Sequence, residues 1–565
     1  MPPLFHRAKL PLCRCHSATH RRFTAPFTSL LPALSPPCFP LCLQIKTHFT
    51  HNTMTHFTTL AEMIAIHAEQ TPDATAMSAP DSKPLSYAGL HQLVVQTVSK
   101  LNALGIGRGD RVGIVLPNCP EMATAFVAVA SACTAAPLNM AYRADEFEFY
   151  LNDLKAKALI VATGSDTPAR AVAAKLGVAV LELDAHPEMG AGHFELKGTA
   201  LTGSALATTG MAQTGDIALI LHTSGTTSRP KIVPLSHRNV CASARNISAT
   251  LKLTPADREL HIMPLFHIHG LIAGVLAPMA VGSQIFCTPG FNALKFFGWM
   301  KECKPTWYTA VPTMHQTILS RAAGNADVIK ATPLRFIRSS SSSMPTQVIA
   351  ELEKVFNAPL IESYGMTEAA HQMSSNPLPP AKRIPGSVGL AAGPDVGIMD
   401  LQGTLLAAGE IGEIVIRGEN VTTGYENNDK ANAEAFTHGW FRTGDQGTLT
   451  EDGYLTLTGR LKEIINRGGE KISPREVDEV LMDHPAVLQV VTFAMPHPKL
   501  GEDVAAAVVL RENMTLTERD LRDFAATKLA DFKVPKKVLF LAEIPKGATG
   551  KLQRIGLAEK LGLGG

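Results

Sequence analysis

The chain has no uninterrupted apolar run of the length that a membrane-spanning helix needs, so a membrane protein is not expected. Five of its nine cysteines lie outside residues 1–53, and these five form neither a metal-binding spacing nor a disulfide framework, so reduced intracellular thiols are predicted. A strong basic excess is also missing, because the net charge is only +2 over 565 residues. This balance argues against binding nucleic acid through a basic surface. The composition, 45% hydrophobic and 18% charged, is typical of a globular protein with two or more domains.

Acidic residues are absent from the start of the chain, and the first one is Glu62. Residues 1–53 contain six Lys or Arg, whereas the remainder has 46 basic and 50 acidic residues. Such an extension is typical of an organellar transit peptide, or Met54 is the true start, which the abrupt change in composition favours. The C-terminus lacks a peroxisomal signal of the Ser-Lys-Leu type, so a cytoplasmic protein is expected, or an organellar one if the extension is genuine.

Apolar strand candidates alternate with helical patterns from Met54 to about residue 455. A packed helix is predicted at 121–130, and strands are predicted at 112–116, 159–162, 217–221 and 307–311. This alternation is typical of a large α/β body with a parallel sheet.

After Gly459 the pattern of predicted helices and strands changes and indicates a separate compact unit. A capping box at 473–476 predicts a helix start with proline at its first position. Strand candidates at 490–494 and 505–510 and a helix from Thr517 follow. Together they predict a small α+β domain of about a hundred residues.

A Walker loop is also missing, but another phosphate-binding pattern is present. Residues 223–231 read Thr-Ser-Gly-Thr-Thr-Ser-Arg-Pro-Lys and directly follow the strand candidate 217–221. Hydroxyls, backbone N–H groups around Gly225 and two cations suit a polyphosphate. The Walker spacing of Gly, four residues and Gly-Lys-Ser/Thr does not occur in this loop. A Ser/Thr-rich surface turn would explain the hydroxyls, but not Pro230-Lys231 after a buried strand.

Five more motifs follow this loop, at 263–270, 362–368, 439–445, 459–463 and 545–551. With all six in this order, the chain closely resembles the adenylate-forming superfamily of acyl-CoA synthetases, firefly luciferases and peptide-synthetase adenylation domains. The resemblance extends from about Leu60 to Arg554. It implies an α/β fold with a large adenylate-forming domain of several subdomains and a small mobile α+β lid domain. The implied segments are the extension 1–53, the AMP-binding domain 54–458, a hinge 459–462 and the lid 463–561.

The resemblance also implies ATP, Mg²⁺ and coenzyme A as cofactors and cosubstrate, with a small carboxylic acid as substrate. The residues that it places on phosphates are Thr223, Ser224, Gly225, Thr226, Thr227 and Lys231. Those that it places on the adenosine are Ser341, Ser342, Tyr364, Asp445 and Arg460. Its catalytic residues would be Lys551 between carboxylate and α-phosphate, Thr367 on the α-phosphate, Glu368 on Mg²⁺, and His267 as gate of the acyl pocket. Gly468 and Gly469 would let the pantetheine arm approach once the lid rotates about Lys462.

Each of these residues also has an ordinary interpretation. Glu368 alone would be a solvated or helix-capping acid, and Lys551 a solvated lysine. Asp445 alone would be a turn residue, His267 a core histidine, and Gly468-Gly469 a plain turn.

Serines at 340–343 stand where a Gly-Ala-Ala-Pro type segment is common in the superfamily, and Ser228 and Ile232 replace two glycines. With these departures, the chain resembles the oxalate–CoA ligases in the stretches 224–231, 267–270, 307–315, 368–377 and 465–474. Oxalate would need donors for its second carboxylate, and the candidates are His267, His315, His371 and Ser340, with the serines that follow it. We therefore expect an ATP-dependent acid–CoA ligase for oxalate. The alternatives are a medium-chain fatty acid or 4-coumarate-type CoA ligase, a domain that loads a carrier protein, and an inactive nucleotide-binding relative.

Overall fold

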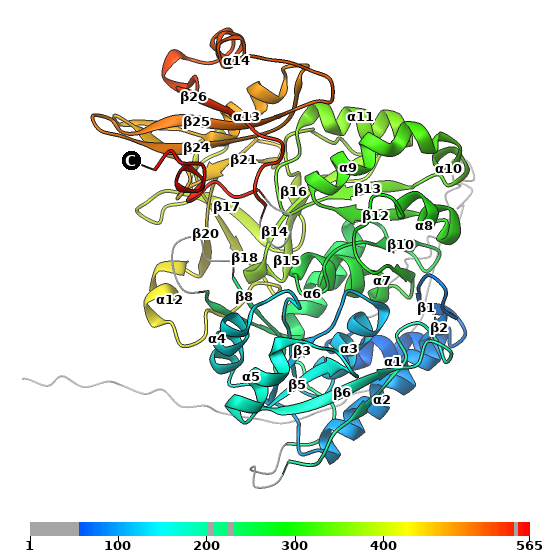
Figure 1. Cartoon of the computed structure of the whole chain (residues 1–565). Coiled ribbons are helices and arrows are strands. Elements are labelled where there is room, and N and C mark those ends of the chain that lie inside the picture. The colour runs from blue at the N-terminus through cyan, green and yellow to red at the C-terminus, as the bar shows by residue number, and fades with distance from the viewer. Residues whose placement is uncertain (1–55, 202–207, 224–229, 547–551, 565) are drawn as a thin grey trace, which may run out of the picture. The chain divides into compact units, whose positions relative to one another are not determined.

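A computed structural model describes residues 56–201, 208–223, 230–546 and 552–564. Residues 54–565 form one compact unit, to which the following description applies (Figure 1). The predictions for residues 1–53, Ser224 to Thr227 and Lys551 lie outside the described residues. None of the helices within these ranges has the length and hydropathy needed to cross a bilayer.

A nine-stranded sheet forms the centre of the large domain, in the order β16-β15-β14-β13-β12-β10-β11-β1-β2. The strands from β14 to β1 run parallel, and the remaining neighbours are antiparallel. Its strands are β1 (Thr75–Ser78), β2 (Leu85–Ser86), β10 (Arg258–His261), β11 (Gln284–Cys287), β12 (Trp307–Ala310), β13 (Phe336–Ser339), β14 (Leu360–Met366), β15 (His371–Ser375) and β16 (Leu390–Ala391).

A second sheet has seven strands in the order β7-β6-β5-β3-β4-β8-β9. Five of them are parallel, and β7 and β9 pair antiparallel at the two edges. Its strands are β3 (Arg111–Val115), β4 (Thr134–Pro137), β5 (Ala158–Ala162), β6 (Ala179–Ala185), β7 (Phe194–Lys197), β8 (Ile217–His222) and β9 (Ile232–Ser236).

Two five-stranded sheets complete the described structure. One consists of β17 (Asp395–Met399), β18 (Gly412–Arg417), β19 (Phe436–Thr437), β20 (Trp440–Leu449) and β21 (Leu455–Arg460). The other belongs to the small C-terminal domain and consists of β22 (Ile465–Arg467), β23 (Glu470–Ile472), β24 (Val487–His497), β25 (Gly501–Leu510) and β26 (Lys537–Phe540).

Helices cover these sheets and connect their strands. Those of the large domain are α1 (Leu60–Gln70), α2 (Tyr87–Ala103), α3 (Pro120–Ala130), α4 (Ala144–Leu154), α5 (Pro168–Leu176), α6 (His237–Thr250), a π-helix (His269–Leu276), α7 (Ala277–Ala280), α8 (Phe296–Cys303), α9 (Pro312–Ala322), α10 (Ala326–Ala331), α11 (Thr346–Phe356) and α12 (Asp429–Ala435). Those of the small domain are α13 (Pro474–Met482), α14 (Glu518–Ala526) and α15 (Leu557–Lys560).

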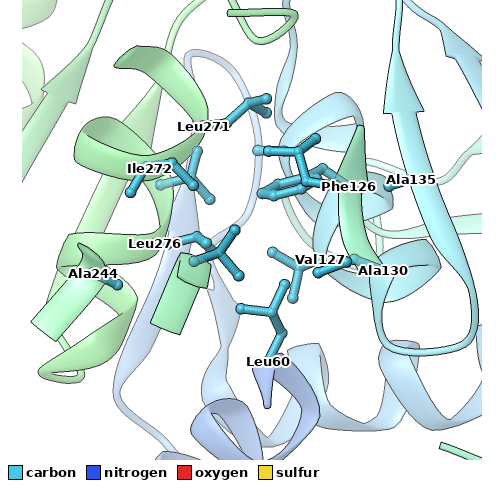
Figure 2. Packing of buried hydrophobic residues seen from close by; sticks show 14 of the residues in the cluster. Leu60, Phe126, Val127, Ala130, Ala135, Ala244, Leu271, Ile272 and Leu276 are labelled. Carbon is cyan, nitrogen blue, oxygen red and sulfur yellow. The ribbon is translucent and has the colours of Figure 1, made fainter. Parts of the chain in front are cut away.

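The main core lies where helices from different parts of the chain meet. Figure 2 shows side chains of α1, α3, α6 and the π-helix pointing toward one another. Leu60, Val127 and Leu276 are fully buried at its centre. Helix α6 packs against strands β8 and β9 of one sheet and β15 of the other. This shared core therefore joins the two large sheets, since removal of apolar surface from water is the main stabilising force.

The predicted α/β architecture is confirmed, with a large N-terminal and a small C-terminal domain. Strands predicted at 112–116 and 159–162 are β3 and β5, which pair in parallel. The capping residue Ser473 accepts a hydrogen bond from the Glu476 N–H at 3.4 Å, and α13 begins at Pro474 as predicted. The two C-terminal strands are longer than predicted, because β24 pairs with β25 from Val487 to His497, beyond the apolar residues that signalled each strand.

Buried histidines give the fold a pH dependence that can be measured. His237 at the start of α6 is fully buried, its Nδ1 accepts the Leu60 N–H at 3.2 Å, and its Nε2–H donates to the Ala130 carbonyl at 2.9 Å. Burial lowers the pKa of His237 from 6.5 to about 4. At a pH between these two values, His237 is protonated in the unfolded chain but neutral in the folded chain. The free energy of unfolding therefore falls as the pH falls.

We expect this loss to reach about 3 kcal/mol for His237. Urea unfolding of the wild type and of His237→Gln, measured across the same pH interval, checks the expectation. The variant is expected to be less stable at neutral pH but to lose less stability on acidification. An equal pH slope in both proteins would assign the acid sensitivity to other groups.

Candidate active site

Several predicted site residues lie near the carboxyl ends of neighbouring strands. Strands β12, β13 and β14 are adjacent and parallel in the nine-stranded sheet (Figure 1). Ser340 to Ser342 directly follow β13, Tyr364 lies in β14, and Thr367 and Glu368 follow β14 in a 3₁₀ turn. Open α/β sheets bind ligands outside the carboxyl ends of their strands, so the fold brings these residues to the expected edge.

The three serines after β13 differ in their surroundings. Ser340 is buried, and its hydroxyl donates to the Ser363 carbonyl at 3.1 Å. Ser341 is half-buried and has a φ of 75°, in the left-handed region that side chains seldom adopt. Ser342 is exposed. The sheet therefore holds Ser340 in place, whereas Ser341 and Ser342 border solvent.

Three of the residues predicted to contact the adenosine are joined by hydrogen bonds. Asp445 in β20 and Arg460 in β21 are direct cross-strand neighbours, and the Arg460 Nε–H donates to the Asp445 carboxylate at 3.0 Å. The Tyr364 hydroxyl donates to the other Asp445 oxygen at 2.5 Å. Burial, followed by the charge of Asp445, raises the pKa of Tyr364 well above its ordinary value. Asp445 is thus a buried carboxylate held in one orientation, as an acceptor for sugar hydroxyls must be.

Glu368 is also a buried carboxylate. Its side chain accepts the Tyr425 hydroxyl at 2.8 Å, and the Lys231 Nζ lies 4.2 Å from the centroid of the Tyr425 ring. Burial raises the pKa of Glu368, while the Tyr425 hydrogen bond acts in the opposite direction. The Tyr425 side chain thus contacts both Glu368, in the turn after β14, and Lys231.

This donor set fits Mg²⁺ that arrives with a nucleotide. In the described part of the chain, no three His, Cys, Asp or Glu side chains gather to hold a metal alone. Mg²⁺ is commonly held by one or two carboxylates together with phosphates and water. Glu368 supplies one such carboxylate beside a lysine of the phosphate loop.

The predicted phosphate loop connects two antiparallel strands, β8 and β9, at the edge of the seven-stranded sheet. Its ends are held together by the Thr223 N–H, which donates to the Lys231 carbonyl at 3.0 Å. The Lys231 N–H in turn donates to the Thr223 hydroxyl at 3.3 Å. The strand before the loop was predicted, but the hairpin was not, because the alternation of apolar residues does not reveal which strand pairs with which.

A cluster of histidines lies beside the serines. The His269 and His371 rings stack with centroids 4.8 Å apart and 18° between their planes. The His269 Nδ1 lies 3.1 Å from the Ser341 hydroxyl, and the His267 Nδ1 accepts the His269 N–H at 3.2 Å. Of the predicted substrate donors, the structure therefore brings His267 and His371 together around His269.

His315 lies elsewhere in the core. It is fully buried, and its Nδ1 lies 3.2 Å from the hydroxyl of Tyr308. Burial lowers the pKa of His315 from 6.5 to about 4. Tyr308 and Thr309 are consecutive in β12 and so point to opposite faces of the sheet. The hydroxyl contact of His315 is therefore on the face opposite to the one that Thr309 and the His269 cluster share.

Gly468 and Gly469 form the turn between β22 and β23. Their φ values of 61° and 104° lie in the left-handed region that favours glycine. A tight hairpin turn is therefore enough to explain the two consecutive glycines. A role toward the pantetheine arm stays a prediction, as does the role of Lys462 as a hinge.

Three residues with prominent positions in the structure were not predicted from the sequence. They are Tyr425 on Glu368, His269 at the centre of the histidine cluster, and Arg338, a fully buried arginine in β13. One signal was present for Arg338, since it is the single charge within the strand sequence Phe-Ile-Arg-Ser. For Tyr425 the sequence carries no comparable signal, because its partner is 57 positions away.

Comparison with known proteins gives matches over most of the chain. The AMP-binding enzyme family matches residues 64–426, and the AMP-binding enzyme C-terminal domain matches residues 476–551. An oxalate–CoA ligase of Arabidopsis thaliana is 45% identical over 88% of this chain and 97% of its own length. An oxalate–CoA ligase of Saccharomyces cerevisiae is 42% identical over 80% of this chain and 87% of its own length.

More distant matches also extend over most of the chain. A sulfoacetate–CoA ligase of Cupriavidus necator is 34% identical over 89% of this chain and 97% of its own length. The crystal structure of ATP-bound MatB from Rhodopseudomonas palustris is 29% identical and superposes with a TM-score of 0.80, covering 88% of this chain and 98% of that one. The chain therefore belongs to the AMP-binding enzyme family, the adenylate-forming acid–CoA ligases.

Proposed function

We propose that the chain is an ATP-dependent acid–CoA ligase whose substrate is oxalate. The observation that carries the substrate is the polar cluster of His269, His371 and Ser341, with the buried cation Arg338 behind it. A pocket for a long apolar acid needs apolar walls, whereas a small dianion needs donors where water is removed. The two oxalate–CoA ligases among the relatives support the same substrate. Sulfoacetate, named for another relative, is also a small acid with a second negative group.

In the first half-reaction, a carboxylate oxygen of the acid attacks the α-phosphorus of ATP. The new oxygen–phosphorus bond replaces the bond to the β-phosphate, and diphosphate leaves. Thr223 and Lys231 of the phosphate loop would hold the β- and γ-phosphates, Thr367 would donate to the α-phosphate, and Lys551 would neutralise the two approaching anions. Mg²⁺ on Glu368 would further reduce the negative charge of the phosphates.

Binding of the nucleoside would use the oriented carboxylate of Asp445. Its two oxygens are the acceptors for the ribose hydroxyls, and Arg460 and Tyr364 keep them in place. Such preorganisation lowers the entropy that is lost when ATP binds.

In the second half-reaction, the thiolate of CoA attacks the carbonyl carbon of the acyl-adenylate. A thioester forms, the bond to the phosphate oxygen breaks, and AMP leaves, while the thiol proton passes to solvent. The lid would withdraw Lys551 and bring the Gly468-Gly469 turn to the pantetheine arm, with His267 bordering the acyl pocket.

The test is CoA-dependent AMP formation by the full chain with oxalate, malonate, octanoate and 4-coumarate at equal concentration. We expect kcat/KM for oxalate to exceed that for octanoate and 4-coumarate by at least about 100-fold, because polar groups left without partners strongly disfavour an apolar acid. A preference for octanoate or 4-coumarate would keep the reaction and replace the substrate. Absence of ATP–pyrophosphate exchange with every acid would favour the inactive nucleotide-binding alternative.

A further inference from the structure

Arg338 is an unusual residue for the interior of a sheet. It lies in β13, is fully buried, and has no Asp or Glu as an ion-pair partner among the residues that the structure describes. Its Nε also lacks a hydrogen-bond partner there. Burial lowers the pKa of Arg338 to about 9, so the side chain is still a cation at neutral pH. A buried charge without a counter-ion destabilises a fold, and its presence calls for a functional reason.

The neutral partners of Arg338 are fixed in their orientation. The Nη2–H donates to the Gln372 Oε1 at 3.2 Å, and the Gln372 amide nitrogen donates to Thr250 and to the Ala392 carbonyl, each at 3.2 Å. The Nη1–H faces the Thr309 hydroxyl and the His269 Nε2, each at 3.3 Å. Arginine can only donate hydrogen bonds, so both of these atoms must accept.

These contacts determine where the proton of His269 lies. Thr309 accepts from Arg338, and its own hydroxyl proton therefore points to the His269 Nε2, which is 2.6 Å away. A proton on Nε2 would meet the donors of Arg338, so the imidazole carries its proton on Nδ1. That Nδ1–H donates to the Ser341 oxygen at 3.1 Å. The hydroxyl proton of Ser341 is then directed away from His269.

Ser341 and His371, on either side of His269, have strained backbones. Their φ values are 75° and 96°, and neither residue is a glycine. Left-handed conformations of such residues cluster at functional sites, where the surrounding structure enforces them. Ser341 is half-buried at the carboxyl end of β13, so its hydroxyl lies at the border between the polar cluster and the site.

We propose that Arg338 is a positioning and specificity residue that acts through Thr309, His269 and Ser341. The chain of hydrogen bonds makes the Ser341 hydroxyl a donor to the second, non-reacting carboxylate of a small dianionic acid, and the cation behind it favours the dianion. This inference rests on the proposed function and deepens it. Arg338 itself does not touch the reacting atoms.

Oxamate provides a probe, because it has the size of oxalate but replaces the second carboxylate with an uncharged amide. Arg338→Met is expected to raise the KM for oxalate about tenfold, while the inhibition constant of oxamate and the KM for ATP change less than about twofold. Arg338→Lys retains the charge and is expected to recover part of the loss. An apolar residue of similar volume in place of a buried charge often leaves stability unchanged, so the melting temperature of Arg338→Met should not fall.

Two further variants separate positioning from a structural role. Arg335→Met breaks the ion pair between Arg335 and Asp257 beside the other end of β13 and so controls for general destabilisation. We expect it to leave the ratio of the oxalate KM to the oxamate inhibition constant unchanged. Ser341→Ala should reproduce the selectivity loss, and the double variant with Arg338→Met should be clearly less than additive, since both act in one chain of contacts.

Each outcome bears on one of the two proposals. Equal losses of oxalate and oxamate binding in Arg338→Met, or additive effects with Ser341→Ala, would overturn the positioning role and leave the oxalate ligase in place. A wild-type chain that activates other acids but not oxalate would overturn the proposed substrate, and with it the role of Arg338 toward a dianion.

Discussion

Replacing Glu368 with glutamine is expected to lower the rate of ATP–pyrophosphate exchange by about 100- to 1000-fold. The carboxylate is buried, and Tyr425 is its hydrogen-bond donor at 2.8 Å. An amide of the same shape keeps the packing but removes the charge that would hold Mg²⁺ on the leaving diphosphate. Exchange measured at saturating ATP and oxalate, with Mg²⁺ varied, is the readout. The concentration of Mg²⁺ for half-maximal rate should rise in parallel.

The fold of Glu368→Gln should remain intact, because the buried carboxylate stabilises the folded state little. Burial raises its pKa, which means that the protein interior disfavours the charged form. Thermal unfolding therefore serves as the control, and a melting temperature near that of the wild type is expected. Tyr425→Phe keeps the carboxylate and removes only its donor, so its exchange rate should fall much less, by about tenfold. An unchanged exchange rate in Glu368→Gln would exclude Glu368 as the metal ligand.

Much of the fold could be predicted from the sequence, because buried parallel strands and packed helices have patterns of apolar residues that are visible within a few positions. The strands at 112–116 and 159–162 and the helix at 121–130 are examples, and all three are confirmed. Motif residues were found for a similar reason, since each motif is contiguous. The family itself is confirmed by matches that extend over most of the chain.

The contacts in the interior of the site could not be predicted in the same way. His269 and Arg338 are 69 positions apart, and each has an ordinary interpretation when read alone. Their relationship depends on the register of β12 and β13, which places Thr309 directly beside Arg338. Register follows from tertiary packing, not from local composition, so only the folded chain reveals that a cation lies behind the histidine cluster. The hinge at 459–462 and the individual roles of the site residues stay predictions.

Asp445→Asn is expected to raise the KM for ATP by about 30- to 100-fold, with a smaller effect on the exchange rate at saturating ATP. The carboxylate is buried and accepts from Tyr364 at 2.5 Å and from Arg460 at 3.0 Å. Asparagine presents one acceptor oxygen and an NH₂ group, so it cannot accept from both partners and from two ribose hydroxyls. The NH₂ group would also face one of these donors. The variant should therefore lose both the ribose contact and the orientation of Tyr364.

Asp216→Asn is the matched control for this prediction. Asp216 also accepts from an arginine Nε, that of Arg108 at 2.6 Å, but it lies at the start of β8, away from the nucleotide residues. Both variants lose a charge-assisted hydrogen bond to an arginine, and thermal unfolding of each reports how much stability is lost. Only Asp445→Asn should change the KM for ATP. If Asp216→Asn raised this KM by the same factor, loss of stability would explain the effect, and Asp445 would have no direct part in nucleotide binding.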